Sequence, residues 1–276
     1  MRATTLLFHD VVPAGLWASS GMQGPDADIY KLNCVEFRQH LRAISQQVPN
    51  PPITVPGLLD GLSAGHDVLL TFDDGGVSGL NYIADMLDEF AWKAHFLVTA
   101  GRISTPGFLS PNQIRELHRR GHIIGSHSYS HPERMSFCTR AELDEEWRRS
   151  TSVLSEIIGE RIRVASVPCG YYSPHVASSA ARSGIRWLFN SEPVVHSHSV
   201  DGCMVLGRFT IKRGDSPERS AAISAGAKRP RIQQYLFWNF KKTLKVLGGT
   251  AWLRLRIFLL ARLARISSKL ESGAKT

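Results

Sequence analysis

The sequence predicts an α/β fold whose parallel sheet closes into a barrel. About seven short apolar segments have the character of strands, and most of them alternate with segments of helical apolar spacing. Polar residues suited to catalysis directly follow several of these strands: His9, Asp73, Asp74, His127 and the turn at 168–170. In β/α barrels the loops after the strands open on one rim, where catalytic groups gather. Both observations favour a barrel with its active site on that rim.

The first elements run from the N-terminus to residue 90. Residues 4–8 form an apolar strand, and the polar, glycine- and proline-rich residues 13–33 are expected to form a surface loop. A helix is predicted over 35–48, where apolar residues recur at helical spacing until a Pro-Asn-Pro-Pro run ends it. Strand 68–72 and a helix near 79–90 follow.

The rest of the chain continues the alternation. Further strands are predicted at 95–99, 122–126, 163–167, 185–189 and 204–211. Further helices are predicted at 111–120, 139–158 and 174–183. The 139–158 helix begins with a capping box, in which Thr139 is the N-cap and Glu142 its reciprocal partner.

The charge divides the chain into two parts. The 276 residues carry a net charge of +9, with 43% hydrophobic and 21% charged residues, which is ordinary for a globular protein. Residues 228–276 hold twelve Lys/Arg and one acid, whereas the rest of the chain has a net charge of −2. We therefore expect a near-neutral barrel over residues 1–215 and a basic tail over 228–276.

The cysteines and the N-terminus favour a cytoplasmic protein. None of the four cysteines lies in a CxxC spacing, so reduced thiols are favoured over a disulfide pair. The first ten residues lack the apolar core of a signal peptide. We expect no conventional membrane span, because the sequence holds no uncharged apolar run of about 18 residues. The predicted location is the cytoplasm, with peripheral contact at the inner membrane face left open.

Two adjacent carboxylates mark the candidate site. Strand 68–72 delivers Asp73 and Asp74 to its end, and side-by-side carboxylates are costly unless a positive charge lies near them. The next ligand candidates are His127 and His131, which follow strand 122–126. Two imidazoles and one carboxylate leave coordination positions open, which is the ligand count of a catalytic metal site. The alternatives without a metal are purely structural: the aspartates would cap a turn, and the histidines would lie in a polar loop.

The same residues carry a family resemblance. T-F-D-D-G at 71–75 and H-S-Y-S-H at 127–131 resemble the first two motifs of the polysaccharide deacetylases, the NodB-homology domain of carbohydrate esterase family 4. The flanking segments 94–99 and 121–126 are also similar to that family, and the resemblance covers roughly residues 1–215. It implies a distorted (β/α)7 barrel, to which the tail would add a C-terminal helical appendage.

The resemblance implies roles for the motif residues. Asp73 would be the general base, and Asp74, His127 and His131 would bind a divalent metal. Zinc suits these ligands best, although Co²⁺, Ni²⁺ or Fe²⁺ would also be accepted.

His9 is the candidate general acid. Family members usually carry this histidine late in the chain, but the late His196 and His198 do not follow a strand predicted for that role. L-L-F-H-D at 6–10 fits instead, which implies a circularly permuted arrangement similar to the poly-β-1,6-N-acetylglucosamine deacetylases. Asp10 would orient His9 or cap a turn, and the alternative is that His9 is an ordinary histidine at a strand end.

The third family motif is altered here. The family has Arg-Pro-Pro-Tyr-Gly where this chain has Ser-Val-Pro-Cys-Gly at 166–170. A backbone N–H at Cys169 could still complete the oxyanion hole, since that role needs no side chain. Gly170 and Tyr171 are further candidates for contact with the oxyanion or the substrate. Arg208 is the candidate substitute for the missing arginine. The fourth motif is only hinted at by Trp187, which could equally belong to the core.

The tail has the pattern of a basic amphipathic helix. Arg254, Arg262, Arg265 and Lys269 share one side of a helical wheel, and leucine and isoleucine cover much of the rest. Such a helix lies in an anionic membrane interface. The alternative is a helix docked on the barrel or on a partner chain, and no nucleic-acid partner is expected.

These observations predict a metal-dependent carbohydrate N-deacetylase. Its substrate would be an N-acetylhexosamine-containing saccharide or glycolipid. The missing export signal and the cationic tail favour a lipid-linked saccharide at the inner leaflet. Two alternatives stay open: an amidohydrolase on a non-sugar C–N substrate, and a carbohydrate-binding barrel that has lost catalysis.

Overall fold

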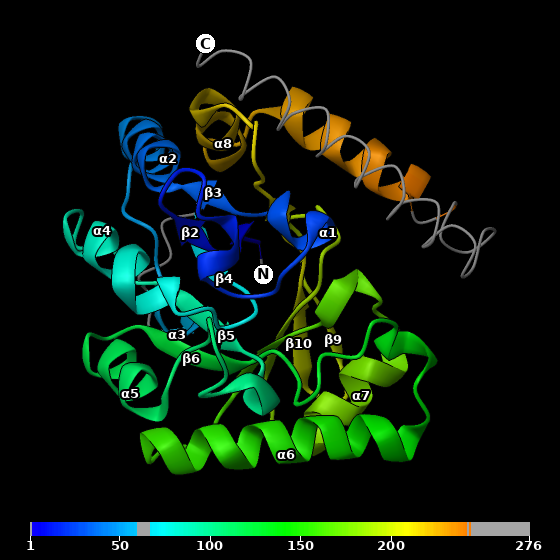
Figure 1. Cartoon of the computed structure of the whole chain (residues 1–276). Helices are drawn as coiled ribbons and strands as arrows, with labels where there is room; N and C mark the ends of the chain where they lie inside the picture. Colours follow the sequence, from blue (N-terminus) through cyan, green and yellow to red (C-terminus); the bar gives the residue numbers. More distant parts are fainter. Residues whose placement is uncertain (1, 60–66, 242, 244–276) are drawn as a thin grey trace.

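A computed structural model describes residues 2–59, 67–241 and 243. Its main feature is a nine-stranded sheet in the order β11-β1-β4-β5-β6-β7-β8-β10-β9, which curls into a half-barrel (Figure 1). The neighbouring strands pair in parallel except β9, which runs antiparallel to β10. The strands are β1 Thr4–Phe8, β4 Val68–Phe72, β5 His95–Val98, β6 Ile123–Ser126, β7 Val164–Ser166, β8 Trp187–Phe189, β9 His198–Val200, β10 Cys203–Leu206 and β11 Phe209–Thr210.

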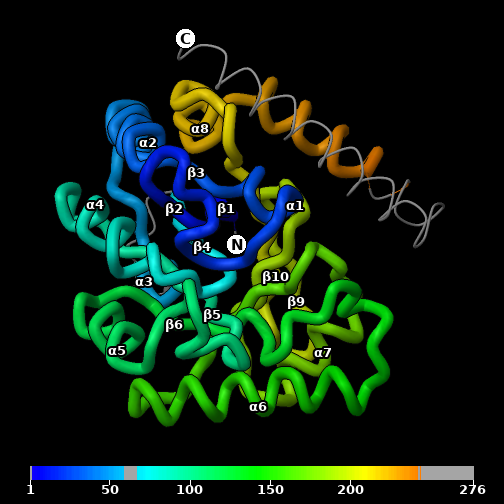
Figure 2. Tube along the Cα trace, in the orientation of Figure 1, coloured from blue at the N-terminus to red at the C-terminus, as the bar shows by residue number. Residues whose placement is uncertain are grey.

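Helices cover the outside of the sheet (Figure 2). They are α1 Pro25–Asp28, α2 Cys34–Gln47, α3 Val55–Leu59, α4 Ala84–Asp88, α5 Pro111–Arg119, α6 Arg140–Ile158, α7 Pro174–Arg182 and α8 Pro217–Ser224. Short 3-10 turns occur at Trp17–Ser19, Ala100–Arg102, Met135–Phe137 and Pro168–Gly170. Parallel strands that alternate with outer helices confirm the predicted barrel-type α/β fold.

Local sequence signals set the helix starts. The capping box predicted for Thr139 and Glu142 is present at the start of α6, and Ser110 with Gln113 forms another at α5. Each box satisfies two backbone N–H groups that have no partner within the helix. The predicted helix near 79–90 begins instead as a π-helical turn over Gly79–Ile83 and continues as α4.

Two predictions about the chain path were wrong. Residues 13–33 are not simply a surface loop, because their last residues form β3 (Leu32–Asn33), which pairs in parallel with β2 (Val11–Val12). Leu32 is buried, and so is Lys31, whose Nζ donates to the Trp17 carbonyl at 2.5 Å. The single strand predicted at 204–211 is also interrupted. It is divided into β10 and β11, which lie at different places in the sheet, and Arg208 lies between them.

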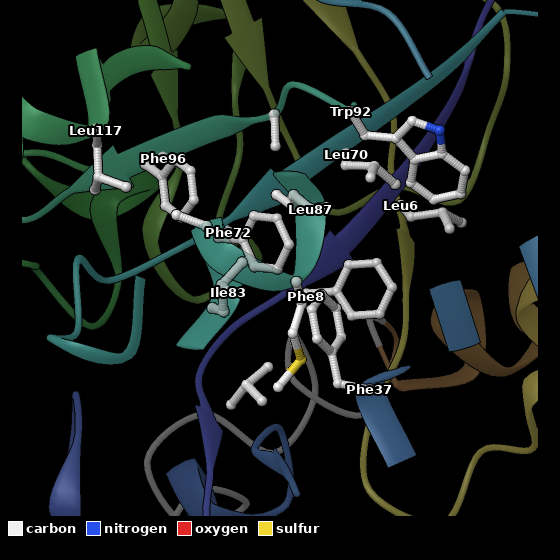
Figure 3. Close-up of a cluster of buried hydrophobic side chains, with 14 of the residues drawn as sticks. Leu6, Phe8, Phe37, Leu70, Phe72, Ile83, Leu87, Trp92, Phe96 and Leu117 are labelled. Atoms are coloured by element: carbon white, nitrogen blue, oxygen red, sulfur yellow. The ribbon is translucent and has the colours of Figure 1, made fainter. Parts of the chain in front are cut away.

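Stacked aromatic rings support the strand ends that lead into the rim. Phe8, Phe72 and Phe96 come from the neighbouring strands β1, β4 and β5 (Figure 3). The ring centroids of Phe8 and Phe72 lie 5.5 Å apart, and those of Phe72 and Phe96 lie 5.2 Å apart. Phe37 of α2 meets two of these rings edge-on. Each buried aromatic ring removes a large apolar area from water. This core fixes Phe8 and Phe72, the residues that directly precede His9 and Asp73.

Residues beyond 215 continue to pack on the barrel. α8 packs on α2, where the His40 and Ser220 side chains lie 2.8 Å apart. Residues 228–241 are helical and lie beside β11, with Gln234 bonded to the backbone of Thr210. Residue 242 and residues 244–276 lie outside the described residues, and with them lies the predicted amphipathic pattern at 252–269. No described helix is long and apolar enough to cross a membrane.

All four cysteines are free, as the sequence predicts. They are spread over the fold, from the start of α2 (Cys34) to β10 (Cys203), and only Cys169 is classed as exposed.

Two buried histidines should make stability depend on pH. His95 Nε2 accepts the Val55 N–H at 3.0 Å, so its Nδ1 donates to the Leu70 carbonyl at 2.9 Å, and the ring is neutral. Burial lowers the pKa of His95 to about 4 and that of His122 to about 4. The unfolded values are about 6.5, so the unfolded chain binds more protons between these limits. The free energy of unfolding is therefore highest above pH 6.5, where both histidines are neutral in the unfolded chain as well. It falls as the pH drops toward 4.

Urea unfolding at pH 7.5 and pH 5, with a chelator present, measures this effect. Linkage between the two pKa values gives a loss of about 2 kcal/mol per histidine at pH 5. His95→Gln should therefore reduce the difference between the two pH values by about that amount. The matched control is His175→Gln, because His175 is exposed. An unchanged difference in His95→Gln would show that protonation of this ring does not set the acid sensitivity.

Candidate active site

Asp73 and Asp74 lie in a tight turn at the end of β4. Asp74 has φ 74° and Gly75 has φ 81°, both in the left-handed region. A Cβ at Gly75 would lie 2.9 Å from Val98 Cγ1, so glycine is needed for both its conformation and its size. The Asp73 N–H donates to the Phe8 carbonyl, and the Asp74 carbonyl accepts from Thr99 N–H. The turn holds both carboxylates, which are buried, at the rim of the sheet.

The loop after β6 supplies two histidines. His127 directly follows the strand and is buried, and its N–H donates to the Val98 carbonyl of β5. Glu146 of α6 then accepts the N–H groups of Tyr129 and Ser130 at 2.9 and 2.8 Å. His131 has φ 63°, and its N–H donates to Ser128 Oγ at 3.0 Å. Helix α6 therefore holds the loop in the shape that returns His131 to the site.

Asp74, His127 and His131 meet at one point. The Nε2 atoms of both histidines lie 3.4 Å from Asp74 Oδ1, and one ligand atom of each residue lies within 4.8 Å of the others. These separations are longer than good hydrogen bonds and short enough for all three atoms to reach one cation. The residues therefore fit a divalent metal. The structure brings together the three ligands that the sequence predicts.

The electrostatics of this cluster keep Asp74 ionised. Burial raises the pKa of Asp74, but the adjacent imidazoles of His127 and His131 and the charge of His9 outweigh it, so the pKa lies well below its usual value. Burial lowers the pKa of His131, and contact with Asp74 more than reverses this. An ionised carboxylate facing two ring nitrogens is the donor set that zinc and similar metals prefer.

Asp73 is held by a buried arginine. Arg208, which is fully buried, donates from its two terminal nitrogens to Asp73 Oδ1 and Oδ2 at 2.7 and 2.8 Å. Its Nε donates to the Asn190 carbonyl at 2.8 Å, which fixes the guanidinium plane. Burial raises the pKa of Asp73, but Arg208 and then His127 outweigh it, and the net pKa is lowered. Asp73 is therefore ionised and oriented at neutral pH.

Ser166 links Asp73 to His127. Its hydroxyl donates to Asp73 Oδ1 at 3.0 Å, so its oxygen accepts from His127 Nδ1–H at 2.6 Å. This bond fixes the His127 tautomer with a free lone pair on Nε2, the atom that faces Asp74. Ser166 and Arg208 therefore both bond Asp73, and Arg208 does so from a distant part of the chain.

His9 extends the site along the rim. It follows β1, which pairs with β4 in the sheet, and its ring lies against Tyr30 with centroids 4.8 Å apart. His9 Nδ1 is buried and has no hydrogen-bond partner among the described residues. Burial lowers the pKa of His9, and the charges of Asp74 and Asp73 act in the opposite direction. Both carboxylates therefore interact electrostatically with His9, which places His9 beside the aspartates.

Asp10 does not orient His9. Its Oδ1 accepts from Ser20 Oγ at 2.6 Å and from Ser78 Oγ at 2.7 Å. Its carboxylate approaches Gly21 and Gly76 so closely that a Cβ on either would clash with it. Asp10 thus joins the 13–33 segment to the turn after β4, and burial raises its pKa.

The altered third motif lies at the end of β7. Cys169 is exposed with φ 54°, and Gly170 has φ 67°. The Tyr171 ring lies against Phe137 and Arg134. Trp187 is buried in β8 as part of the core, which favours the core interpretation of this residue.

Local sequence patterns did not identify several site residues. Ser166 stands out in the sequence only as a replacement for arginine, and no sequence pattern singles out Tyr30 or Glu146. Glu146 lies on the expected 139–158 helix, but no sequence pattern shows that this helix crosses the histidine loop. Tyr30 lies in the segment that was expected to be a surface loop.

Comparisons with known proteins show which family this chain is similar to. A family model described as polysaccharide deacetylase matches residues 62–188. The putative polysaccharide deacetylase YxkH of Bacillus subtilis is 25% identical over 54% of this chain and 53% of its own length. The peptidoglycan-N-acetylmuramic acid deacetylase PdaA of Bacillus subtilis is 24% identical over 54% of this chain and 58% of its own. The chain thus spans about half the length of these curated relatives.

Solved structures share the fold. The Streptococcus pyogenes deacetylase PplD, in complex with acetate, superposes with a TM-score of 0.66 at 19% identity, covering 79% of this chain and 96% of PplD. IcaB from Ammonifex degensii superposes with a TM-score of 0.64 at 21% identity, covering 81% of this chain and 97% of IcaB. The structures therefore share the fold of this chain, and its residues 62–188 are similar to the polysaccharide deacetylase family model.

Proposed function

We propose that this chain is a metal-dependent hydrolase that removes N-acetyl groups from an N-acetylhexosamine-containing saccharide or glycolipid. The observation that carries the proposal is one rim where Asp74, His127 and His131 converge beside Asp73, an ionised carboxylate held by Arg208. Amide hydrolysis needs an activated water, a polarised carbonyl and a proton for the leaving amine. Zinc is the proposed metal, with Co²⁺, Ni²⁺ or Fe²⁺ as accepted substitutes.

Asp73 is the proposed general base. Its Oδ2 carries one of the Arg208 hydrogen bonds, whereas Oδ1 accepts from both Arg208 and Ser166. Oδ2 also lies on the side of His127, 3.9 Å from its Nε2. Oδ2 is therefore the atom that takes the proton of the attacking water. When bound, a divalent cation supplies Lewis-acid chemistry to the acetyl carbonyl and the water.

His9 is the proposed general acid, which would give its proton to the leaving amine. The strand order supports this role. His9 follows β1, Asp73 follows β4, and β1 lies between β11 and β4 in the sheet. A circularly permuted barrel would have this strand order, and the permutation stays a prediction. Cys169, Gly170 and Tyr171 remain proposed donors to the oxyanion or the substrate.

The substrate class is proposed from the relatives and the tail. PdaA is named for a peptidoglycan sugar, and a matching protein of Colletotrichum lindemuthianum is named a chitin deacetylase. Both names refer to N-acetylated saccharides. A lipid-linked substrate, cytoplasmic placement and contact of residues 228–276 with an anionic membrane remain predictions from the sequence.

Acetate release from a substrate panel tests the proposal. The purified full chain is incubated with N-acetylglucosamine oligomers, an N-acetylglucosamine glycolipid and simple non-sugar acetamides. We expect acetate from the sugars, loss of turnover after chelation of the metal, and recovery when Zn²⁺ is added back. Turnover of the acetamides alone would favour the non-sugar amidohydrolase. Metal and sugar binding without turnover would favour the binding barrel, although the Arg208–Asp73 pair removes the main reason for that alternative.

A further inference from the structure

Exposed apolar side chains form a strip on the helix at residues 228–241. The strip consists of Ile232, Tyr235, Leu236, Phe237 and Phe240, and Leu236 and Phe240 are each 62% exposed. Ile232, Leu236 and Phe240 recur every four residues, so they share one face of the helix. Large exposed apolar patches of this kind mark sites of interaction with a protein or a membrane.

The opposite face of this helix is fixed to the sheet. Arg231 donates to Thr4 Oγ1 and to the Ile223 carbonyl, both at 2.6 Å. The Gln234 side chain accepts from Thr210 N–H at 3.0 Å and donates to the Thr210 carbonyl at 2.9 Å. These bonds pair the backbone N–H and carbonyl of Thr210 in β11, an edge strand, and the helix lies outside the sheet (Figure 1). The side chains of the strip are exposed, so the strip faces away from the barrel.

The helix also has a defined direction along the sheet. Arg231 meets Thr4 at the start of β1, whereas Phe237 lies 5.8 Å from Lys212 Nζ, which follows the end of β11. β1 and β11 are parallel, so the C-terminal ends of both strands lie at the rim that carries His9. The apolar strip therefore runs toward the catalytic rim.

Charge distinguishes the possible occupants of the strip. Residues 228–241 contain four Lys/Arg and no acid, and Lys212 and Lys241 both lie over the Phe237 ring. A second copy of the chain would bring two such positive faces together, which costs free energy. Residues 242–276 hold eight Lys/Arg and one acid, so they add to the positive charge of this part of the chain. An anionic lipid surface complements both the charge and the aromatic side chains.

We propose that the apolar strip docks this protein on an anionic lipid bilayer, with the helix lying along the surface and running toward the catalytic rim. Leu236 and Phe240 enter the interface, Lys228 and Arg229 contact the headgroups, and the Arg231 and Gln234 bonds fix the barrel relative to the bilayer. The docking is independent of catalysis. Its use for a lipid-linked saccharide rests on the proposed deacetylase function.

Co-sedimentation of the full chain with vesicles tests this proposal without substrate, so its outcome is separate from that of the deacetylase assay. We expect binding to vesicles that contain 30 mol% phosphatidylglycerol and little binding to pure phosphatidylcholine. Leu236→Ser with Phe240→Ser should weaken the partition coefficient by at least about tenfold. Phe137→Ser is the matched control, because Phe137 is 65% exposed on a different part of the barrel, and it should bind as the parent chain does.

Three results would overturn the proposal. One is equal vesicle binding by the parent chain and the double variant. Another is a change from dimer to monomer in the double variant with vesicle binding unaltered, which would identify a second copy as the occupant. The third is a clear fall in the thermal midpoint of the double variant, since that would show that these side chains are covered within the chain itself.

Discussion

Asp73→Asn is expected to reduce acetate release by about 10²–10⁴-fold while the metal site keeps its affinity. The amide has nearly the same shape as the carboxylate but cannot take a proton from water. Asp73 is not among the three residues whose ligand atoms converge, so metal binding should persist. Steady-state acetate release and competition with a chromophoric chelator measure the two properties separately.

The adjacent residue gives the matched comparison. Asp74→Asn should weaken metal binding strongly, because Asp74 Oδ1 faces both histidine Nε2 atoms. Asp85→Asn, an exposed surface aspartate, should alter neither property. Turnover of Asp73→Asn within tenfold of the parent chain, with metal bound, would contradict the assignment of Asp73 as the base.

Arg208→Leu is expected to lower the free energy of unfolding by about 3–5 kcal/mol and to impair turnover. The substitution removes both hydrogen bonds to Asp73 and leaves that carboxylate buried without its main partner. Removing one member of a buried pair costs far more than the pair contributes, because the remaining charge is desolvated. Chemical denaturation of the full chain, with the metal chelated, measures the loss.

A double-mutant cycle shows whether the unpaired Asp73 carboxylate causes the loss of stability in Arg208→Leu. Arg208→Leu combined with Asp73→Asn should cost less than the sum of the single changes, because the neutral amide no longer needs the guanidinium. Arg120→Leu is the control, since Arg120 pairs with Asp85 and Glu116 near the surface and should cost at most about 1 kcal/mol. A loss below 1 kcal/mol for Arg208→Leu, or full additivity in the cycle, would mean that the two side chains do not depend on each other.

The sequence by itself predicted much of the fold and the residues of the candidate metal site. Strands such as β1 and β4 are short apolar segments that end in polar residues, so their boundaries follow from hydrophobic pattern alone. The N-cap of α6 is likewise a local signal, because Thr139 and Glu142 are three residues apart. Asp74, His127 and His131 were predictable because the C-terminal ends of parallel strands meet on one rim.

Only the tertiary structure decided how the base is held. Arg208 and Asp73 are 135 residues apart, and the bond between Ser166 and Asp73 spans 93 residues. Hydrophobic period and turn chemistry describe neighbours along the chain, so they do not show which side chains a closed sheet will bring together. The same reason applies to the 13–33 segment, where pairing of β2 with β3 overrides a loop-like composition. Local patterns place groups at the rim, and the packing of distant segments gives each group its partner.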